Sequence, residues 1–382
     1  MRVVVRGKEV VFLWDNFGPY HDDRCRALAN RLGPTWAVCG IELSHQSKIY
    51  SWENGKEILF HKETLTSGVS IEDIPFFDRF VRMLSACLRH LGGFYFLCHY
   101  ERPEILLVAG VLRILGQKVF TMQDSKFDDY DRFLYREILK ALFYLPYQGV
   151  ITSGTRSMDY MRFLRFSKNH ISDGYDTVSI ERIRALAGSP PAPRGVPFRD
   201  RHFTIIARLV AKKNLSMALD AYALYRTLDT NPRSLHLCGS GPLEAELRAQ
   251  ARALGIDDHV VFRGWIQAEE TCQTLASSIA LLLPSNEEQF GLVVVEAQAM
   301  GLPVILSESC GARDRLVRTG VNGFVIEPDN PAGMAFFMNL LCQDEALWQR
   351  MAKAAEEMSS YGDTDRFADG VLRLVRQVGG LA

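Results

Sequence analysis

The chain has 382 residues, enough for two domains, and its 47% hydrophobic and 23% charged residues are typical of a soluble globular protein. The formal net charge of −1 gives no sign of a nucleic-acid-binding protein. The eight cysteines include no CxxC pair, which favours reduced thiols over a disulfide framework or a zinc site. No apolar run approaches the roughly 20 residues of a spanning helix, and the first residues lack a signal-peptide core, so we expect a cytoplasmic protein.

Short apolar runs alternate with helical patterns along the first half of the chain. This alternation predicts a parallel sheet with helices between its strands. The predicted strands are residues 10–14, 35–40, 104–108, 119–122 and 149–152. The predicted helices are residues 22–31, 74–91, 131–145 and 156–165.

Proline and glycine crowd into residues 187–197, where neither a strand nor a helix can continue, so we expect an interdomain linker there. A second alternation of the same kind follows it. Its predicted strands are residues 202–207, 234–238, 260–263, 279–283, 303–306 and 323–326. Its predicted helices include residues 215–225, 243–254 and 293–300. The sequence therefore predicts two α/β domains in tandem.

The segment 284–297 carries two carboxylates, Glu288 and Glu296, eight residues apart. The first lies in the loop after a predicted buried strand, and the second lies on the helix that follows. Gly291 between them leaves the backbone open to a ligand, and the free N–H groups at the start of that helix favour an anion. Two glutamates at this spacing are weak evidence alone, since one commonly lies on a solvated face while the other caps a helix.

Two cations follow the predicted strand at 202–207. Arg208 and Lys213 lie five residues apart, in the loop and at the start of the next helix. An arginine binds a diphosphate through two hydrogen bonds, and a lysine adds a mobile point charge. Taken alone, basic residues at a strand end usually form a solvated rim.

A glycine-rich turn, Gly239-Ser-Gly241, follows the predicted strand at 234–238. It lacks the third glycine of a dinucleotide-binding fingerprint, which counts against an NAD enzyme. We expect it to form a tight turn between strand and helix that lets a nucleotide lie close.

Several of these segments resemble the retaining glycosyltransferases with the GT-B fold, chiefly family four, the group 1 glycosyl transferases. EQFG at 288–291 and EAQAMGLPVI at 296–305 resemble the E-x7-E segment of that family. RLVAKKN at 208–214 resembles its cationic motif, with Ala207 in place of a glycine, and FRGW at 262–265 resembles the next element. The resemblance is specific over residues 204–330 and looser over residues 10–180.

The resemblance implies the fold and the domain organisation. It implies two Rossmann-like, doubly wound parallel-sheet domains that face a central cleft. The N-terminal domain, residues 1–190, would bind the acceptor, and the C-terminal domain, residues 198–362, would bind the donor. In this family the last helix commonly crosses back to the first domain, so residues 363–382 are expected to pack there.

The resemblance also implies a reaction, the transfer of a sugar from a nucleotide-sugar donor, such as a UDP- or GDP-sugar, to a hydroxyl acceptor with retention. Glu288 would bind hydroxyls of the donor sugar, and Glu296 would hold the ribose. Arg208 and Lys213 would stabilise the leaving diphosphate together with the helix N-terminus. The scheme requires no metal and no cofactor. Further donor contacts are expected at Phe290, Gly291, Leu292, Gly239 and Gly264.

In the first domain the family's first strand–helix loop lies over the donor phosphates and the acceptor. Gly18 permits close approach of the backbone, and His21 would bind the acceptor or a sugar hydroxyl. The alternative is that His21 only starts the helix while Arg24 pairs locally. A DxD-like triplet within 128–131 precedes a helix, so we interpret it as helix-start charge rather than a metal site. Arg132 is expected to form a structural salt bridge with Glu137.

Relatives of this kind build bacterial polysaccharide or lipopolysaccharide, so we expect a glycan or lipid-linked saccharide acceptor and peripheral contact with the inner face of the membrane. The aromatic runs at 94–97 and 142–147 are expected to be buried core rather than acceptor contacts. Two alternatives are a nucleotide-sugar epimerase on the same fold, which needs no acceptor, and a non-catalytic sugar-nucleotide-binding partner of another transferase.

Overall fold

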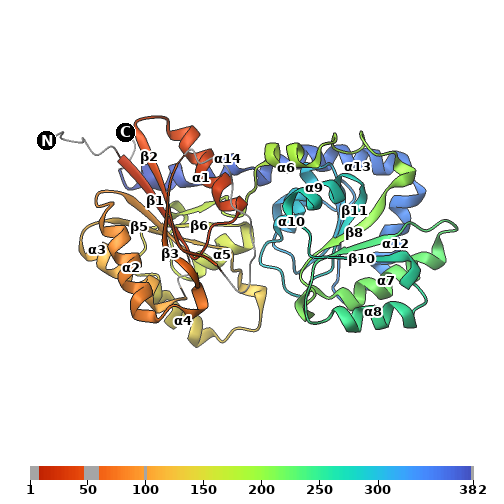
Figure 1. The fold of residues 1–382 in the computed structure, drawn as a ribbon, viewed down its shortest axis with the longest axis horizontal. Coiled ribbons are helices and arrows are strands. Elements are labelled where there is room, and N and C mark those ends of the chain that lie inside the picture. The colour runs from red at the N-terminus through yellow and green to blue at the C-terminus, as the bar shows by residue number, and fades with distance from the viewer. Residues whose placement is uncertain (1–7, 47–59, 99–100, 380–382) are drawn as a thin grey trace. The chain divides into compact units, whose positions relative to one another are not determined.

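The computed structural model describes residues 8–46, 60–98 and 101–379. The chain divides into two compact units, and each contains a parallel β-sheet flanked by helices (Figure 1). The first unit comprises Met1–Phe127, Asp131–Thr177 and Thr364–Ala382, and the second comprises Asp128–Tyr130 and Val178–Asp363. The division after Thr177 therefore precedes the proline-rich stretch at 187–197.

The first sheet has seven parallel strands in the order β3-β2-β1-β4-β5-β6-β7. The strands are β1 (Lys8–Trp14), β2 (Trp36–Gln46), β3 (His61–Ser70), β4 (Phe94–Leu97), β5 (Lys118–Gln123), β6 (Val150–Thr152) and β7 (Ile171–Asp173). The helices of this unit are α1 (Pro19–Leu32), α2 (Phe76–Leu88), α3 (Pro103–Ile114), α4 (Leu134–Phe143), α5 (Thr155–Phe163) and α14 (Thr364–Gln377).

Alternation along β1 divides the core of the first unit into two layers. Val11 and Leu13 pack with buried residues of α2 and α3 on one face of the sheet. Val10, Phe12 and Trp14 pack on the other face with residues of α1 and α14. Because side chains alternate between the two faces of a strand, a continuous apolar run is what a strand covered on both faces requires.

The predicted strand at 104–108 is wrong, because these residues belong to helix α3. Pro103 occupies the first turn of α3, and Ile105, Val108, Ala109 and Leu112 form its buried face at the i, i+3, i+4, i+7 spacing of a helix. The prediction missed three strands of this sheet, β3, β4 and β7, and the four residues of β4 are all buried. The expectation of buried core at 94–97 is therefore confirmed.

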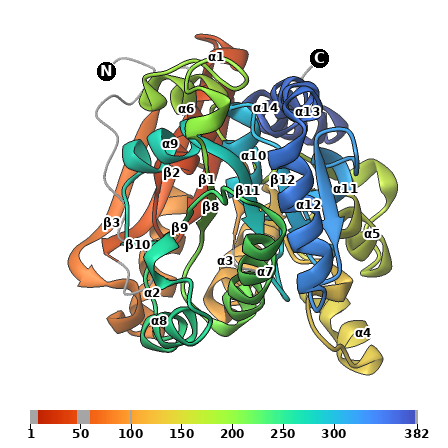
Figure 2. The same ribbon diagram turned by 90° about the vertical axis from the view of Figure 1, so that its right-hand side faces the viewer.

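The second sheet has six parallel strands in the order β10-β9-β8-β11-β12-β13, and all six predicted strands of this half are found in it. They are β8 (His202–Ile206), β9 (Leu235–Cys238), β10 (Val260–Gly264), β11 (Ser278–Leu283), β12 (Val304–Ser307) and β13 (Gly323–Ile326). The helices are α6 (Ile180–Ala187), α7 (Leu215–Leu228), α8 (Glu244–Ala253), α9 (Ala268–Ala276), α10 (Leu292–Ala299), α11 (Arg313–Leu316), α12 (Pro331–Gln343) and α13 (Glu345–Met358). Among these helices, α7 and α12 lie side by side (Figure 2).

Each sheet has a point at which the strand order reverses. In the first sheet the reversal lies between β1 and β4, and in the second it lies between β8 and β11. In open α/β sheets ligands bind at such a switch point, outside the carboxyl ends of the strands. The loops after β1, β8 and β11 are therefore the places to examine for a site.

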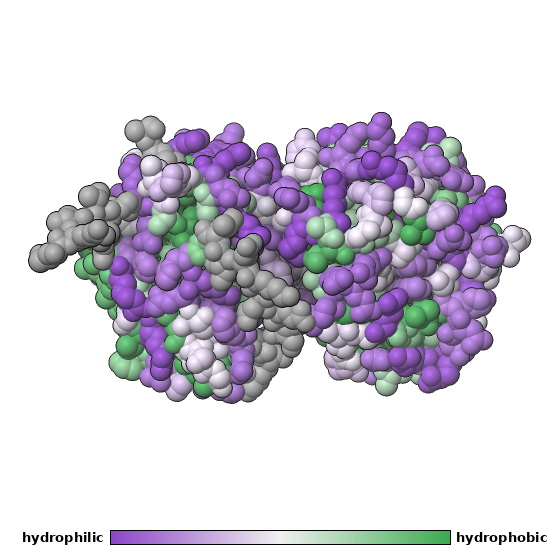
Figure 3. Space-filling model, turned by 45° about the horizontal axis from the view of Figure 1, so that its top comes forward, coloured by the Kyte–Doolittle hydropathy of each residue, from purple (hydrophilic) through white to green (hydrophobic). Residues whose placement is uncertain are grey.

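The hydropathy of the surface and the state of the cysteines are those expected from the sequence. On the face shown in Figure 3, outside the grey atoms, hydrophilic residues predominate and hydrophobic residues form small separate groups. All eight cysteines are free thiols, as their spacing predicts. Within the described residues, no helix combines the length and the apolar character that crossing a membrane requires.

Candidate active site

Two loops of the second unit meet at the switch point between β8 and β11. The loop after β8 carries Arg208 and Lys213, and the loop after β11 carries Glu288. Since β8 and β11 are adjacent and parallel, both loops leave the same edge of the sheet. The topology therefore brings together two segments that lie about 75 residues apart in the sequence.

Main-chain hydrogen bonds join these two loops. The carbonyl of Lys212 accepts from the N–H of Asn286 at 2.8 Å and from that of Glu287 at 3.3 Å. The side-chain amide of Asn214 donates to the carbonyls of Pro284 at 3.1 Å and Pro328 at 2.7 Å. The position of Lys213 relative to the β11 loop is thus set by the backbone carbonyl of Lys212 on one side and the side-chain amide of Asn214 on the other.

Asn214 is a residue whose structural role the sequence motif did not reveal. It begins α7 with a φ of 55°, in the left-handed region, which asparagine tolerates better than most residues. An asparagine directly before an apolar helical pattern was the available signal, because such residues commonly cap helices. Its amide here serves a different purpose, since it bonds the β11 loop rather than its own helix.

Glu288 and Lys213 contact each other directly. Glu288 is only 8% exposed, and Lys213 Nζ donates to its Oε2 atom. Ser285 Oγ donates to the same oxygen at 3.1 Å. A buried carboxylate needs such compensation, and the lysine supplies it. Because an ammonium has three donors, Lys213 can keep this contact and also reach a phosphate oxygen.

The Glu288 loop is also held from the side of β12. The N–H of Gly311 donates to the carbonyl of Glu288 at 3.2 Å, and Cys310 Sγ donates to the carbonyl of Phe290 at 2.9 Å. A Cβ atom at position 311 would lie 1.9 Å from the carbonyl oxygen of Gln289, which is impossible without moving the loop. Gly311 is therefore required for the shape of the loop.

Gly291, Leu292 and Glu296 lie at and beyond the start of α10. Gly291 has a φ of 98°, which glycine adopts at little cost, and it is the residue at which the chain turns into the helix. Leu292 is half-buried, and Glu296 is 7% exposed one turn further along. Burial and the negative charge of Glu296 raise the pKa of the Cys272 thiol to about 12.

The glycines of the turn after β9 support the Arg208 loop. A Cβ atom at Gly239 would lie 1.9 Å from the carbonyl oxygen of Ala207, and one at Gly241 would lie 2.4 Å from that of Leu209. The N–H of Gly239 also donates to the carbonyl of Gly264 at 2.7 Å. The space that these glycines leave is thus filled by the loop that carries Arg208, not left open beside it.

Arg208 itself is exposed at the end of β8. Within the described part of the chain its guanidinium makes no ion pair, unlike the ammonium of Lys213. The structure therefore brings Lys213 and Glu288 into contact and leaves Arg208 on the surface of the same loop. Gly264, at the end of β10, has a φ of 69° and no atom within 4 Å of where its Cβ would lie.

Gly18 and His21 belong to the first unit, in the loop after β1 and the first turn of α1. The N–H of Gly18 donates to His21 Nδ1 at 2.9 Å, and the N–H of His21 donates to the carbonyl of Gly18 at 3.0 Å. His21 therefore does start the helix. A neutral imidazole that accepts at Nδ1 carries its proton on Nε2, so the same geometry presents an N–H donor from the other side of the ring.

Buried charges fix this loop and its surroundings. Glu42 is fully buried on β2 and accepts from the N–H of Phe17 at 2.8 Å. Arg24 forms a buried ion pair with Asp176 at 3.3 Å, so it does not pair locally as the alternative interpretation of this helix start supposed. Sequence spacing gave no signal for either role, because both partners lie far along the chain.

The predicted structural salt bridge between Arg132 and Glu137 is confirmed, with Nη1 and Oε1 3.2 Å apart. The hydroxyl of Tyr160 donates to the other oxygen of Glu137, and Lys140 Nζ donates to that hydroxyl at 2.8 Å. Burial acts to raise the pKa of Glu137, but the bond from Tyr160 and the charges of Lys140 and Arg132 outweigh it. They hold the pKa of Glu137 below its ordinary value.

Comparisons with known proteins agree with this geometry. Residues 193–358 match the family model described as glycosyl transferases group 1. Lipopolysaccharide 1,6-galactosyltransferase from Salmonella typhimurium is 27% identical over 331 residues, which cover 81% of this chain and 88% of that protein. D-inositol 3-phosphate glycosyltransferase from Streptomyces avermitilis is 39% identical over 118 residues, which are 31% of this chain and only 25% of that protein.

The fold has a solved counterpart along the whole chain. The crystal structure of Anabaena HepE in complex with UDP-glucose has a TM-score of 0.70 and 16% sequence identity, and the match covers 98% of this chain and 100% of that one. The matched family segment contains Arg208, Lys213, Glu288 and Glu296. The chain thus has the GT-B fold, and residues 193–358 match the glycosyl transferases group 1, although the chain spans only a quarter of the length of the Streptomyces relative.

Proposed function

We propose that this protein is a glycosyltransferase that takes a sugar from a nucleotide-sugar donor and transfers it to a hydroxyl group, with retention of configuration at the anomeric carbon. The observation that carries the proposal is the contact of Lys213 with buried Glu288 at the switch point of a group 1 domain. A cation beside a carboxylate offers a site for an anionic diphosphate next to a site for sugar hydroxyls.

In this scheme Arg208 and Lys213 bind the diphosphate, and Glu288 accepts hydrogen bonds from the transferred sugar. Glu296 accepts them from the ribose. As the glycosidic bond breaks, negative charge grows on the leaving phosphate, and the two cations and the N–H groups at the start of α10 stabilise it. The leaving phosphate oxygen takes the proton of the acceptor hydroxyl. Catalysis then rests on positioning and electrostatics, without a metal or cofactor.

The relatives suggest which substrates to examine first. The Anabaena structure contains UDP-glucose, so a UDP-hexose is the donor that we propose. The Salmonella relative is named for transfer to lipopolysaccharide, so the acceptor that we propose is a saccharide of a bacterial polysaccharide or lipopolysaccharide, carried on a lipid. A lipid-linked acceptor requires the enzyme to work at a membrane surface.

An apolar surface on α4 supports that part of the proposal. The run at 142–147 was expected to be buried, and Tyr144 and Tyr147 are, but Leu142, Phe143 and Leu145 are 57%, 48% and 75% exposed. Exposed apolar residues continue along the helix and its start. They are Phe133, Leu134, Tyr135, Ile138 and Leu139, each between 57% and 61% exposed. Together these eight residues are called the α4 apolar surface below.

The orientation of α4 explains this exposure. Its buried residue is Glu137, which is 6% exposed and faces Tyr160 and Arg132, so the helix turns its apolar residues outward. Apolar patches of this size on a folded protein mark interaction surfaces. Arg136 is exposed among them, with its guanidinium 5.1 Å from the ring of Phe133. Apolar and basic side chains on one helix favour the interface of a membrane with anionic lipids, where we propose that α4 lies.

A binding experiment tests the donor site. Wild-type protein and the variants Lys213→Ala and Lys212→Ala are titrated with UDP-, GDP-, ADP- and dTDP-sugars, with affinity read by calorimetry. Lys212 is the matched control, because its carbonyl rather than its side chain joins the loops. We expect binding of a UDP-sugar that is about 10- to 100-fold weaker in Lys213→Ala, the loss of one charge-assisted hydrogen bond, and nearly unchanged in Lys212→Ala.

Removing Lys213 leaves a buried carboxylate without compensation, so the double variant Lys213→Ala/Glu288→Gln separates loss of binding from loss of folding. A folded wild-type protein that binds none of the four nucleotide sugars would contradict the donor site and favour a non-catalytic partner that recognises some other ligand. Conversion of the donor sugar without an acceptor would favour an epimerase. Transfer to an acceptor with retained anomeric configuration, measured by NMR of the product, is the expected outcome.

A further inference from the structure

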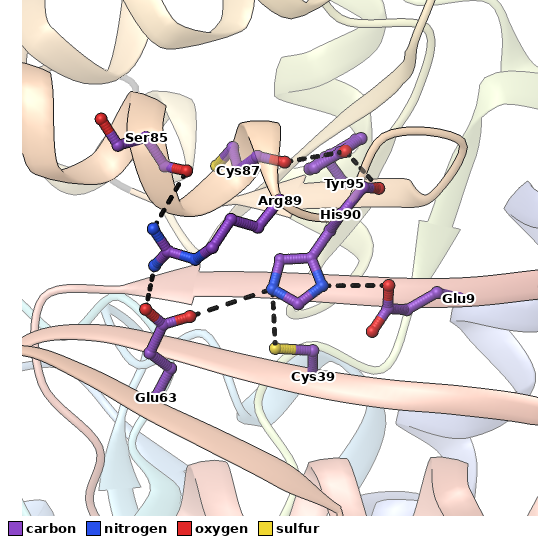
Figure 4. Close-up of polar contacts among 8 residues, drawn as sticks. All are labelled: Glu9, Cys39, Glu63, Ser85, Cys87, Arg89, His90 and Tyr95. Carbon is purple, nitrogen blue, oxygen red and sulfur yellow. Dashed lines mark hydrogen bonds and ion pairs between the residues drawn. The ribbon is translucent and has the colours of Figure 1, made fainter. Parts of the chain in front are cut away.

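Four polar residues gather at the amino-terminal edge of the first sheet, opposite the loop that carries Gly18 (Figure 4). Glu9 lies at the start of β1, Cys39 on β2 and Glu63 on β3. His90 lies in the turn between α2 and β4. These residues have no role in the proposed sugar transfer, so their arrangement needs its own explanation.

The imidazole of His90 lies at the centre of the group. Its Nδ1 atom is 3.0 Å from Glu9 Oε2. Its Nε2 atom is 3.6 Å from Cys39 Sγ and 3.9 Å from Glu63 Oε2. Potential ligand atoms of Glu9, Cys39 and His90 all lie within 4.8 Å of one another. Figure 4 shows the thiol and both carboxylates turned towards the ring.

These separations fit the ligand shell of a tetrahedral zinc-type ion. With a metal–sulfur bond of about 2.3 Å and a metal–nitrogen bond of about 2.05 Å, the sulfur and nitrogen atoms lie about 3.6 Å apart. The separation of Cys39 Sγ and His90 Nε2 has that value. A nitrogen and an oxygen ligand lie about 3.4 Å apart in the same geometry, so the carboxylate of Glu63, 3.9 Å from His90 Nε2, has to move towards the ring before it can bind.

We propose that Cys39, Glu63 and the Nε2 atom of His90 bind a zinc-type divalent cation. Glu9 then accepts the Nδ1–H of the same ring, which is the contact that commonly orients a metal-binding histidine. The fourth position is left for water, and Glu9 and His90 also line a surface hollow of about 420 Å³. Thiolate, imidazole and carboxylate ligands together are typical of zinc.

The site is held in place before an ion arrives. The hydroxyl of buried Tyr95 donates to the carbonyl of His90 at 2.6 Å and to that of Cys87 at 3.1 Å, which fixes the turn at the end of α2. Arg89 pairs with the Oε1 atom of Glu63, so the Oε2 atom remains on the side of the ring. The Glu63 side chain, which is 24% exposed, has to move towards the ring to bind the ion.

The charges of the cluster favour a cation. Binding forms a sulfur–metal bond as the thiol releases its proton to solvent. The thiolate and two carboxylates then surround a 2+ ion, with Arg89 balancing part of the remaining negative charge. The absence of a CxxC pair hides this site in the sequence, since its ligands come from separate strands and a turn.

Metal binding by the full-length, tag-free protein tests the proposal. Chelator-treated protein is titrated with Zn²⁺ against a chromophoric chelator and, separately, with Co²⁺ while visible and near-ultraviolet spectra are recorded. We expect one ion per chain, with the visible bands of tetrahedral Co²⁺ and a thiolate charge-transfer band. Cys39→Ser should lose that band, and Glu63→Gln should bind Zn²⁺ at least about 10-fold more weakly.

Two controls make the result decisive. Cys342→Ser removes the one thiol that is not fully buried, and its spectrum should match that of the wild type. Glu63 is partly exposed, so Glu63→Gln tests the site even if Cys39→Ser proves unstable, and circular dichroism reports folding in each case. A wild-type chain that binds no stoichiometric Zn²⁺ would overturn the proposal. So would a Co²⁺ spectrum that is the same in Cys39→Ser, or Zn²⁺ binding that is unchanged in a folded Glu63→Gln.

Discussion

The α4 apolar surface gives a prediction whose size follows from exposure. Leu134, Ile138 and Leu142 lie one turn apart on the helix and are 59%, 61% and 57% exposed. Full burial of such a side chain is worth about 1.5–3 kcal/mol, so removing its exposed part from water is worth about 1 kcal/mol at an interface. Three glutamine substitutions should therefore cost about 3 kcal/mol of membrane binding, which is about 150-fold in the partition coefficient.

The assay is cosedimentation of the protein with vesicles that contain an anionic phospholipid. Glutamine is a good helix former, so α4 should remain helical in the triple variant, and donor binding serves as a check of folding. The matched control replaces Ile114, Leu228 and Phe336 by glutamine, because these residues are 86%, 53% and 57% exposed on three different helices.

Equal vesicle binding by the triple variant and the wild type would refute the assignment of α4, as would a wild-type protein that does not bind vesicles. Weaker binding by both triple variants would show a general loss of surface hydrophobicity rather than a specific site. If α4 does not bind the membrane, its apolar surface would instead have to bind another partner, such as a second protein. Neutral vesicles should bind the wild type more weakly, because Arg136 then has no anionic headgroup to contact.

Three further predictions concern the loops and the ion pairs. Asn214→Ala should lower the free energy of unfolding by about 1–3 kcal/mol, measured by urea denaturation, because two carbonyls lose their donor; an unchanged value would show that water replaces the amide. Gly311→Ala should lower it by about 1–3 kcal/mol because of the contact with Gln289, whereas Gly110→Ala, which has open space, should not. The pKa of Glu137 is lowered in the folded protein, so its ionised carboxylate stabilises the fold at pH values above its unfolded-state pKa, and this stability should be lost as the pH falls through the folded-state pKa. Tyr160→Phe should make this loss of stability smaller, as measured by denaturation below pH 5. A pH profile of stability identical to that of the wild type would contradict the prediction.

Much of the fold of the second unit follows from local sequence. Its strands are short apolar runs bounded by glycine, proline or charged residues, and all six were found. The prediction at 104–108 failed because the four apolar residues 105–108 fit a buried strand and a buried helix equally well. Only the wider pattern, with Ile105 and Leu112 on one face of a helix, distinguishes them. The exposed face of α4 is unpredictable by hydropathy, since Glu137 is the residue that turns inward.

The candidate site, too, could be predicted only in part from the sequence. Motif spacing located Glu288 and Lys213 in their loops, but their contact depends on β8 and β11 being neighbours, which no local pattern states. Gly239 was expected beside a nucleotide, whereas the atom nearest to its missing side chain is the carbonyl oxygen of Ala207. A glycine in a motif shows that something approaches closely. Only the structure shows that here it is the neighbouring loop.

The joining of the two loops through the Lys212 carbonyl has a consequence for engineering donor preference. Since these bonds use backbone atoms, they do not depend on the side chain at position 212. The conformations themselves are not free, because Asn214 and Gly311 are tied to φ values or distances that few residues satisfy. If loops are exchanged with those of a relative, residues 207–214, 284–291 and 310–312 should therefore be exchanged together. Replacing one segment alone would disrupt the contacts between it and the other two.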